Sequence, residues 1–147
     1  MAHVQDQVGA GRIVSIDVAP QARPVHPRIR YMEGSSIDPA VVSAVRSGIL
    51  PSERVLVILD SLHNRNHVLE ELRVWSPLVA PSGRIIVEDT NINGHPVHTD
   101  YPPDQGPGAW EAVEAFLAEN SDFEVDHAAE RLLLTFNPRG YLRRTGS

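Results

Sequence analysis

Cysteine is absent from this 147-residue chain, which excludes disulfides, thiolate metal sites and cysteine nucleophiles together. Long apolar runs are lacking too, because no stretch approaches the roughly 18 to 20 residues that a membrane span requires. Residues 1–11 also lack the basic start and apolar centre of a secretory signal peptide. We therefore expect a cytoplasmic protein with no membrane partner, in which any metal ion is bound by oxygen or imidazole.

The chain has no long run of like charges, although 19 acidic and 13 basic residues give it a formal net charge of −6. This composition argues against non-specific binding to nucleic acid, so we expect no nucleic-acid partner. Apolar residues make up 41% of the chain, which is enough to bury a core in a domain of ordinary size. We predict one domain over residues 1–147.

Short apolar runs alternate with amphipathic segments along most of the chain. We predict strands at residues 13–16, 28–33, 55–59 and 84–87, and helices at 39–47, 66–79 and 109–117. Residues 122–138 are expected to form two further strands around a short turn. This alternation predicts an α/β fold with a mainly parallel sheet, helices on both faces and an antiparallel C-terminal edge strand.

Acidic and small polar residues follow several of the predicted strands. Asp17, the segment 33–36, Asp60 and the pair Glu88 and Asp89 each stand at the end of an apolar run. The carboxyl ends of parallel strands share one edge, and neighbouring strands lie about 4.8 Å apart, so acids there can converge on one cation. Oxygen ligands suit Mg²⁺, or else Mn²⁺ or Ca²⁺. Solvated acids that merely end their strands are the alternative, and the spacing alone leaves both open.

His63 stands three residues after Asp60, in the connection from a predicted strand to a predicted helix. A neutral imidazole above that edge could take a proton from a bound hydroxyl near neutral pH. A loop histidine that is simply exposed is the competing interpretation, and His67, His95 and His98 are weaker candidates for the same role.

Five segments resemble the cephalosporin hydroxylase family, a branch of the class I S-adenosylmethionine-dependent methyltransferases: "RIRYMEGSSIDP", "VLVILDSLHNRNHVLEEL", "IIVEDTNINGHPV", "GPGAWEAVEAFLAEN" and "LLLTFNPRGYLRR". The resemblance runs from about Gly11 to Arg144. It implies a Rossmann-like sheet with an antiparallel final strand. It also implies Mg²⁺-dependent methylation of a hydroxyl on a small molecule.

The resemblance also implies roles for individual residues. Asp60, Glu88 and Asp89 match the acids that bind Mg²⁺, and His63 occupies the position of the proposed base. Asp17, from which a strand-end acid could also bind a ribose diol, matches the acid that binds the cofactor ribose. The turn Gly34, Ser35 and Ser36 is expected beside the adenine, and Asp60 is expected to contact the cofactor as well as the metal.

Class I methyltransferases place a glycine-rich loop after their first strand. The strand predicted at residues 13–16 would match their second strand, and residues 1–11, which precede it, contain no strand of useful length. We therefore expect the N-terminal part of the fold, with its first strand and glycine loop, to be missing. Loss of a central strand leaves unpaired backbone groups, so the chain should form homo-oligomers. Loss of the glycine loop should leave S-adenosylmethionine bound weakly or not at all.

Three functions from different classes remain compatible with these residues. The first is the O-methyltransferase. The second is a metal-dependent phosphoesterase-like domain, because acids on neighbouring strand ends also support phosphoryl transfer. The third is a catalytically inactive remnant that serves as a structural or oligomeric partner.

Overall fold

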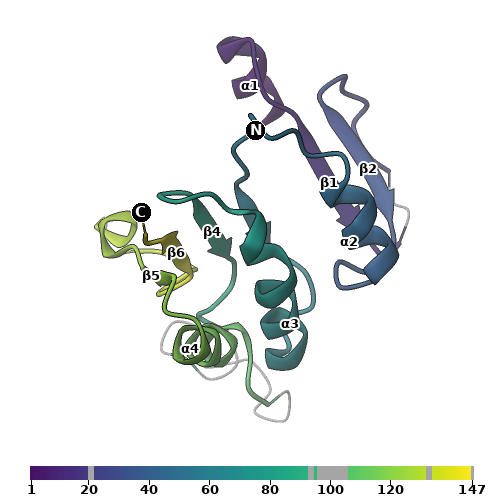
Figure 1. Cartoon of the computed structure of the whole chain (residues 1–147). Helices are drawn as coiled ribbons and strands as arrows, with labels where there is room; N and C mark the ends of the chain where they lie inside the picture. Colours follow the sequence, from purple (N-terminus) through teal and green to yellow (C-terminus); the bar gives the residue numbers. More distant parts are fainter. Residues whose placement is uncertain (20–21, 93–94, 96–105, 132–133, 147) are drawn as a thin grey trace. The chain divides into compact units, whose positions relative to one another are not determined.

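The computed structural model describes residues 1–19, 22–92, 95, 106–131 and 134–146. The chain divides into two compact units, Met1–Leu50 and Pro51–Ser147, each of which has its own sheet (Figure 1). Within the described ranges, no helix has both the length and the apolar character needed to cross a membrane.

The first unit is built on two parallel strands. Its elements are α1 (Ala2–Val8), β1 (Ile13–Asp17), β2 (Ile29–Glu33) and α2 (Pro39–Arg46). In the strand register Ile13 lies opposite Ile29, and Asp17 lies opposite Glu33. Both strands were predicted to within a residue, whereas α1 was not predicted. Because the register pairs the last residues of the strands, their polar ends lie at one edge.

Helix α2 begins where the sequence predicts it. Asp38 is its N-cap, and the Asp38 carboxylate accepts a hydrogen bond of 2.7 Å from the backbone N–H of Ala40. Pro39 takes the first helical position, where its missing N–H is not needed. The helix ends at Arg46, one residue before the predicted end at Ser47, and Ser47 is its C-cap.

The second unit contains a four-stranded mixed sheet. Its elements are β3 (Val57–Leu59), α3 (Arg65–Trp75), η1 (Ser76–Leu78), β4 (Arg84–Val87), α4 (Ala109–Glu119), β5 (Phe123–Val125), η3 (His127–Glu130) and β6 (Tyr141–Arg144). The strand order is β3-β4-β6-β5; β3 and β4 are parallel, and β6 is antiparallel to both of its neighbours. Helices α3 and α4 pack side by side (Figure 1).

The position of the last strand differs from the prediction in two ways. The second strand of the closing pair lies at Tyr141–Arg144, beyond the predicted 122–138, and it is inserted between β4 and β5 instead of at the edge. Leu134 and Phe136, which suggested a strand, are exposed, while Leu142 is fully buried. The sequence of β6 has one buried leucine beside two arginines, so it carries little apolar signal. The strand is nevertheless enclosed between β4 and β5.

The core of the second unit lies between this sheet and its helices. The predicted apolar stripe of α3 is buried, and Asn64 caps the helix by accepting the N–H of Asn66 at 3.0 Å. Fully or almost fully buried apolar side chains come from both helices and from the sheet, among them Leu72, Val113, Phe116, Ile85, Val87 and Leu142. This packing holds the ends of β3 and β4 in a rigid frame.

Candidate metal centre and cofactor residues

The ends of β3 and β4 are adjacent, as the metal-site prediction requires. Leu59 pairs with Val87, and the next N–H along β4, that of Glu88, donates to the carbonyl of Leu59 at 2.9 Å. Asp60 and Glu88 therefore follow their strands at the same edge of the sheet.

Three side chains gather at this edge and form what we call the Asp60–His63–Asp89 cluster. The Nε2 atom of His63 lies 3.7 Å from Oδ1 of Asp60 and 3.5 Å from Oδ2 of Asp89. One ligand atom from each residue lies within 4.8 Å of the other two. The His63 side chain is 23% exposed and that of Asp60 is 61% exposed, so the cluster is open to solvent on its acidic side. These spacings allow a small cation to contact both carboxylates.

Glu88 is close to this cluster without belonging to it, within the part of the chain that the structure describes. Partial burial, and then the charges of Asp60 and Asp89, raise the pKa of its carboxyl above the ordinary value, while His63 opposes the shift. The structure thus groups two of the three predicted metal ligands, Asp60 and Asp89, with His63. The third, Glu88, is repelled by their negative charges. A cation bound here would relieve that repulsion, so the acids present fit a hard divalent ion.

Replacing Glu88 with glutamine is expected to raise the Tm of the metal-free protein at neutral pH. A carboxyl with a raised pKa in the folded state destabilises the fold as the pH climbs above its unfolded value of about 4.3, and glutamine removes this charge. The gain should vanish near that pH, where Glu88 is protonated anyway. Thermal unfolding with a chelator, at neutral pH and at about pH 4, measures this. The control Glu124→Gln, at an exposed acid bonded to Arg143, should show no gain, and equal effects of the two variants would contradict the prediction.

A buried carboxylate on α3 supports the loop between Asp60 and His63. Glu71 is only 1% exposed, and the hydroxyl of Ser61 donates to its Oε2 atom at 2.7 Å. His67 lies 3.6 Å from its other oxygen. The sequence analysis did not single out Glu71. Its place beside the apolar stripe of α3 was a usable signal, since a carboxylate that is buried with such a stripe requires hydrogen-bond partners.

Of the competing histidines, the described ones have other neighbours. His67 faces Glu71, and His95 bonds Glu111 at 2.9 Å while stacking on Trp110 at 4.6 Å between ring centroids. His98 lies outside the described residues. Among the described candidates, only His63 lies beside the acids of β3 and β4.

The predicted cofactor residues of the first unit meet at the ends of β1 and β2. The N–H of Gly34 donates to the carbonyl of Asp17 at 2.9 Å. The Asp17 carboxylate accepts the N–H of Ala19 at 3.1 Å and lies 3.6 Å from the guanidinium of Arg23, which leaves lone pairs for a hydroxyl donor. Gly34 has a φ of 143°, and a Cβ there would lie 2.7 Å from Val41. Only glycine fits this turn without strain.

Ser35 and Ser36 continue this turn toward α2. The Ser35 hydroxyl accepts the N–H of Ile37 at 3.4 Å, and its carbonyl accepts the N–H of Asp38 at 3.0 Å. The turn is therefore ordered by the start of α2. Asp60, the remaining predicted cofactor residue, lies in the second unit.

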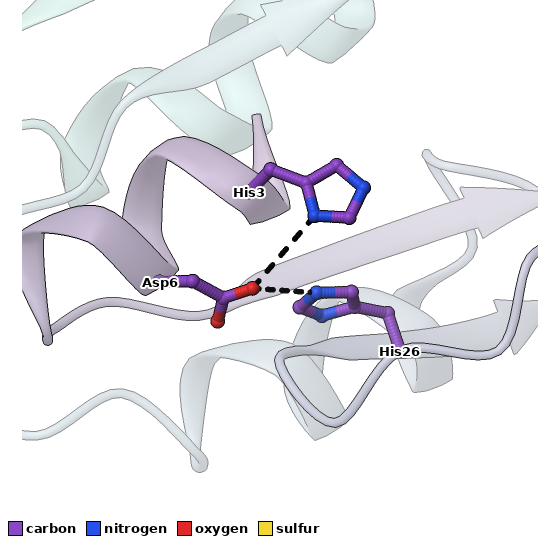
Figure 2. A group of neighbouring side chains, drawn as sticks. All are labelled: His3, Asp6 and His26. Carbon is purple, nitrogen blue, oxygen red and sulfur yellow. Dashed lines mark hydrogen bonds and ion pairs between the residues drawn. The ribbon is translucent and has the colours of Figure 1, made fainter.

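Figure 2 shows a second group of possible ligands, in which His3 and His26 face the carboxylate of Asp6. The backbone N–H of Arg28 donates to Nδ1 of His26 at 3.2 Å, so the neutral ring carries its proton on Nε2, which donates to Asp6 at 2.9 Å. The same arginine bonds the other Asp6 oxygen at 2.7 Å and lowers the pKa of that carboxyl. A metal on Nε2 would need the opposite tautomer, so we assign this group to holding α1 against residues 26–28.

Comparisons with known proteins agree on one family. The family model described as "Rhamnosyl O-methyltransferase/CmcI" matches residues 1–145. Rhamnosyl O-methyltransferases of Mycobacterium tuberculosis and Mycobacterium bovis are 36% identical to this chain, and the match covers 97% of it and 60% of each relative. The homologue from Mycobacterium leprae is also 36% identical, over 90% of this chain and 59% of its own length. The chain thus spans about three fifths of the length of these relatives.

Solved structures give the same fold. MycE methyltransferase from the mycinamycin biosynthetic pathway, in complex with Mg and SAH, aligns with a TM-score of 0.58 at 17% identity, over 92% of this chain and 38% of that one. Its complex with Mg, SAH and mycinamycin VI aligns with a TM-score of 0.57 at the same identity. The predicted Rossmann-like α/β fold is confirmed. That an N-terminal strand is missing stays a prediction.

Proposed function

The chain belongs to the rhamnosyl O-methyltransferase/CmcI family, and on that premise we propose that it contributes to Mg²⁺-dependent transfer of a methyl group from S-adenosylmethionine to a hydroxyl group. The observation that carries the proposal is the Asp60–His63–Asp89 cluster at the ends of two adjacent parallel strands. The acids fit Mg²⁺ by their oxygen ligands, and a cation would offset both the partial burial and the neighbouring charges of Asp60 and Asp89 that raise the pKa of Glu88.

Bound Mg²⁺ would supply Lewis acidity toward the acceptor hydroxyl, and S-adenosylmethionine would supply the methyl group. Asp60 and Asp89 would hold the cation, with Glu88 adding negative charge beside them. His63 takes the hydroxyl proton at Nε2, and its two carboxylate neighbours, at 3.5 and 3.7 Å, stabilise the imidazolium that results. Asp17 would bind the cofactor ribose, and the turn of residues 34–36 would contact the adenine.

The relatives suggest the class of acceptor. Those matched in mycobacteria are named rhamnosyl O-methyltransferases, and one solved structure of MycE contains mycinamycin VI. We propose a hydroxyl on a glycosyl residue of a small molecule, in a cytoplasmic reaction that involves neither nucleic acid nor membrane.

Metal-dependent phosphoester hydrolysis remains the second candidate, because the same acids would support it. It predicts release of phosphate from a generic ester with no affinity for S-adenosylmethionine. An inactive partner protein, the third candidate, predicts a homo-oligomer that binds neither metal nor cofactor. Sedimentation, which measures the oligomeric state, and calorimetric titration of S-adenosylmethionine distinguish the three candidates.

Replacing Asp17 with asparagine is expected to weaken S-adenosylmethionine binding by about tenfold or more, because a hydrogen bond to a charged acceptor contributes roughly 1.5–3 kcal/mol. Calorimetric titration of the cofactor into wild type, Asp17→Asn and the control Asp122→Asn measures this. Asp122 is 61% exposed and pairs with Arg144, so its variant should bind as wild type does. S-adenosylhomocysteine should form only when Mg²⁺ and a rhamnosyl acceptor are both present. Phosphate release in its place would overturn the methyltransferase proposal.

A further inference from the structure

Asp89 has a left-handed backbone conformation, which is uncommon for residues other than glycine and which aspartate and asparagine adopt more readily than most. Its φ is 53°. Such a conformation persists only where surrounding contacts impose it. It turns the chain directly after Glu88 and so determines where the Asp89 carboxylate lies.

The contact that holds this conformation comes from a distant part of the chain. The side-chain Oδ1 of Asn137 accepts the backbone N–H of Asp89 at 2.8 Å, across 48 residues of sequence. Asn137 is itself held on both sides of its backbone: its N–H donates to the Thr135 hydroxyl at 3.0 Å, and its carbonyl accepts the N–H of Gly140 at 2.9 Å. The amide oxygen that meets Asp89 is therefore fixed before any ligand binds.

Residues next to Asn137 form hydrogen bonds with the turn on both sides of Asp89. The N–H of Val87 donates to the carbonyl of Gly140 at 2.8 Å, and the hydroxyl of Thr90 donates to the carbonyl of Pro138 at 2.6 Å. A Cβ at Gly140 would lie 2.1 Å from the carbonyl oxygen of Val87, so the two segments touch backbone to backbone. Asn137 is thus the central member of a rigid support and not an isolated contact.

We propose that Asn137 is a positioning residue that fixes Asp89 for metal binding. This inference rests on the proposed function of the Asp60–His63–Asp89 cluster. A side-chain amide suits the role because it accepts the N–H without adding another negative charge beside Asp60, Glu88 and Asp89. Partners that orient metal ligands in this way typically change metal affinity by about 10- to 100-fold when they are removed.

The test compares Asn137→Ala with a matched asparagine. Asn120 also accepts a backbone N–H through its side chain, that of Asp122 at 2.9 Å, but at an exposed site at the end of α4. Calorimetric titration of Mg²⁺ should show an affinity lower by about 10- to 100-fold for Asn137→Ala and an unchanged affinity for Asn120→Ala. In the metal-free protein, NMR should show faster hydrogen exchange at the Asp89 amide in Asn137→Ala only.

Asn137→Asp separates the hydrogen bond from any general effect of substitution. A carboxylate can still accept the Asp89 N–H, so amide protection should return, and Mg²⁺ affinity should be at least that of wild type because negative charge is added. If Asn137→Ala does not fold, Asn137→Ser and Asn137→Asp carry the same comparison. Wild-type Mg²⁺ affinity with an unprotected Asp89 amide in Asn137→Ala would overturn the inference. A wild type that binds no Mg²⁺ would instead overturn the proposed function, and with it the metal role of Asn137.

Discussion

Replacing His63 with alanine is expected to lower the turnover of methyl transfer by about 10²- to 10⁴-fold, the usual loss when a general base is removed. Its Nε2 atom lies within 3.7 Å of two carboxylates that would stabilise the protonated ring, and the other described histidines face different partners. The rate of formation of S-adenosylhomocysteine at saturating Mg²⁺ and cofactor is the quantity to measure.

His127→Ala is the matched control, because His127 also pairs with a carboxylate, that of Glu130 at 3.6 Å, but its side chain is 79% exposed. Its turnover should equal that of wild type. Mg²⁺ titration then distinguishes a base from a ligand: His63→Ala should bind Mg²⁺ nearly as wild type does. A loss of Mg²⁺ affinity as large as that of an acid variant would reassign His63 to the metal, and full turnover across the pH range would move the base role elsewhere.

Removing the acids of the cluster is expected to abolish Mg²⁺ binding. Asp60→Ala and Asp89→Asn should each weaken it strongly, and the double variant should show no heat of binding, because two carboxylates supply the direct oxygen ligands. Asparagine is chosen at Asp89 because it tolerates the left-handed conformation, so the loss reports charge and not backbone strain. Equal Mg²⁺ affinity in wild type and both single variants would contradict the proposed metal site.

The same variants should lose the stabilisation that Mg²⁺ confers. A ligand that binds only the folded form raises its stability by about 2.7 kcal/mol at 100 times its Kd, so the Tm of wild type should rise with Mg²⁺. Asp122→Asn, at an exposed acid that pairs with Arg144, should respond as wild type does. A rise in Tm that persists in the double variant would show that the ion binds elsewhere.

Much of the fold follows from local patterns in the sequence. The start of α2 depends on Asp38 and Pro39, which are neighbours in the chain, and α3 depends on an apolar period within eleven residues. The adjacency of Asp60 and Glu88 follows from the general rule that parallel strands end at a common edge. Because capping, periodicity and strand direction act over a few residues, they can be read without the tertiary structure.

The contacts that complete the site depend on residues far apart in the chain. Neither the meeting of His63 with Asp89 nor the support of Asp89 by Asn137 follows from any local pattern. The insertion of β6 beside β4 brings residues 136–140 to the turn at Asp89, and the sequence of β6, with one buried leucine, barely indicates a strand. The sequence by itself determined which residue types stand at the strand ends. Only the tertiary structure decided their partners, because a hydrogen bond across 48 residues is set by sheet order and packing and not by local preference.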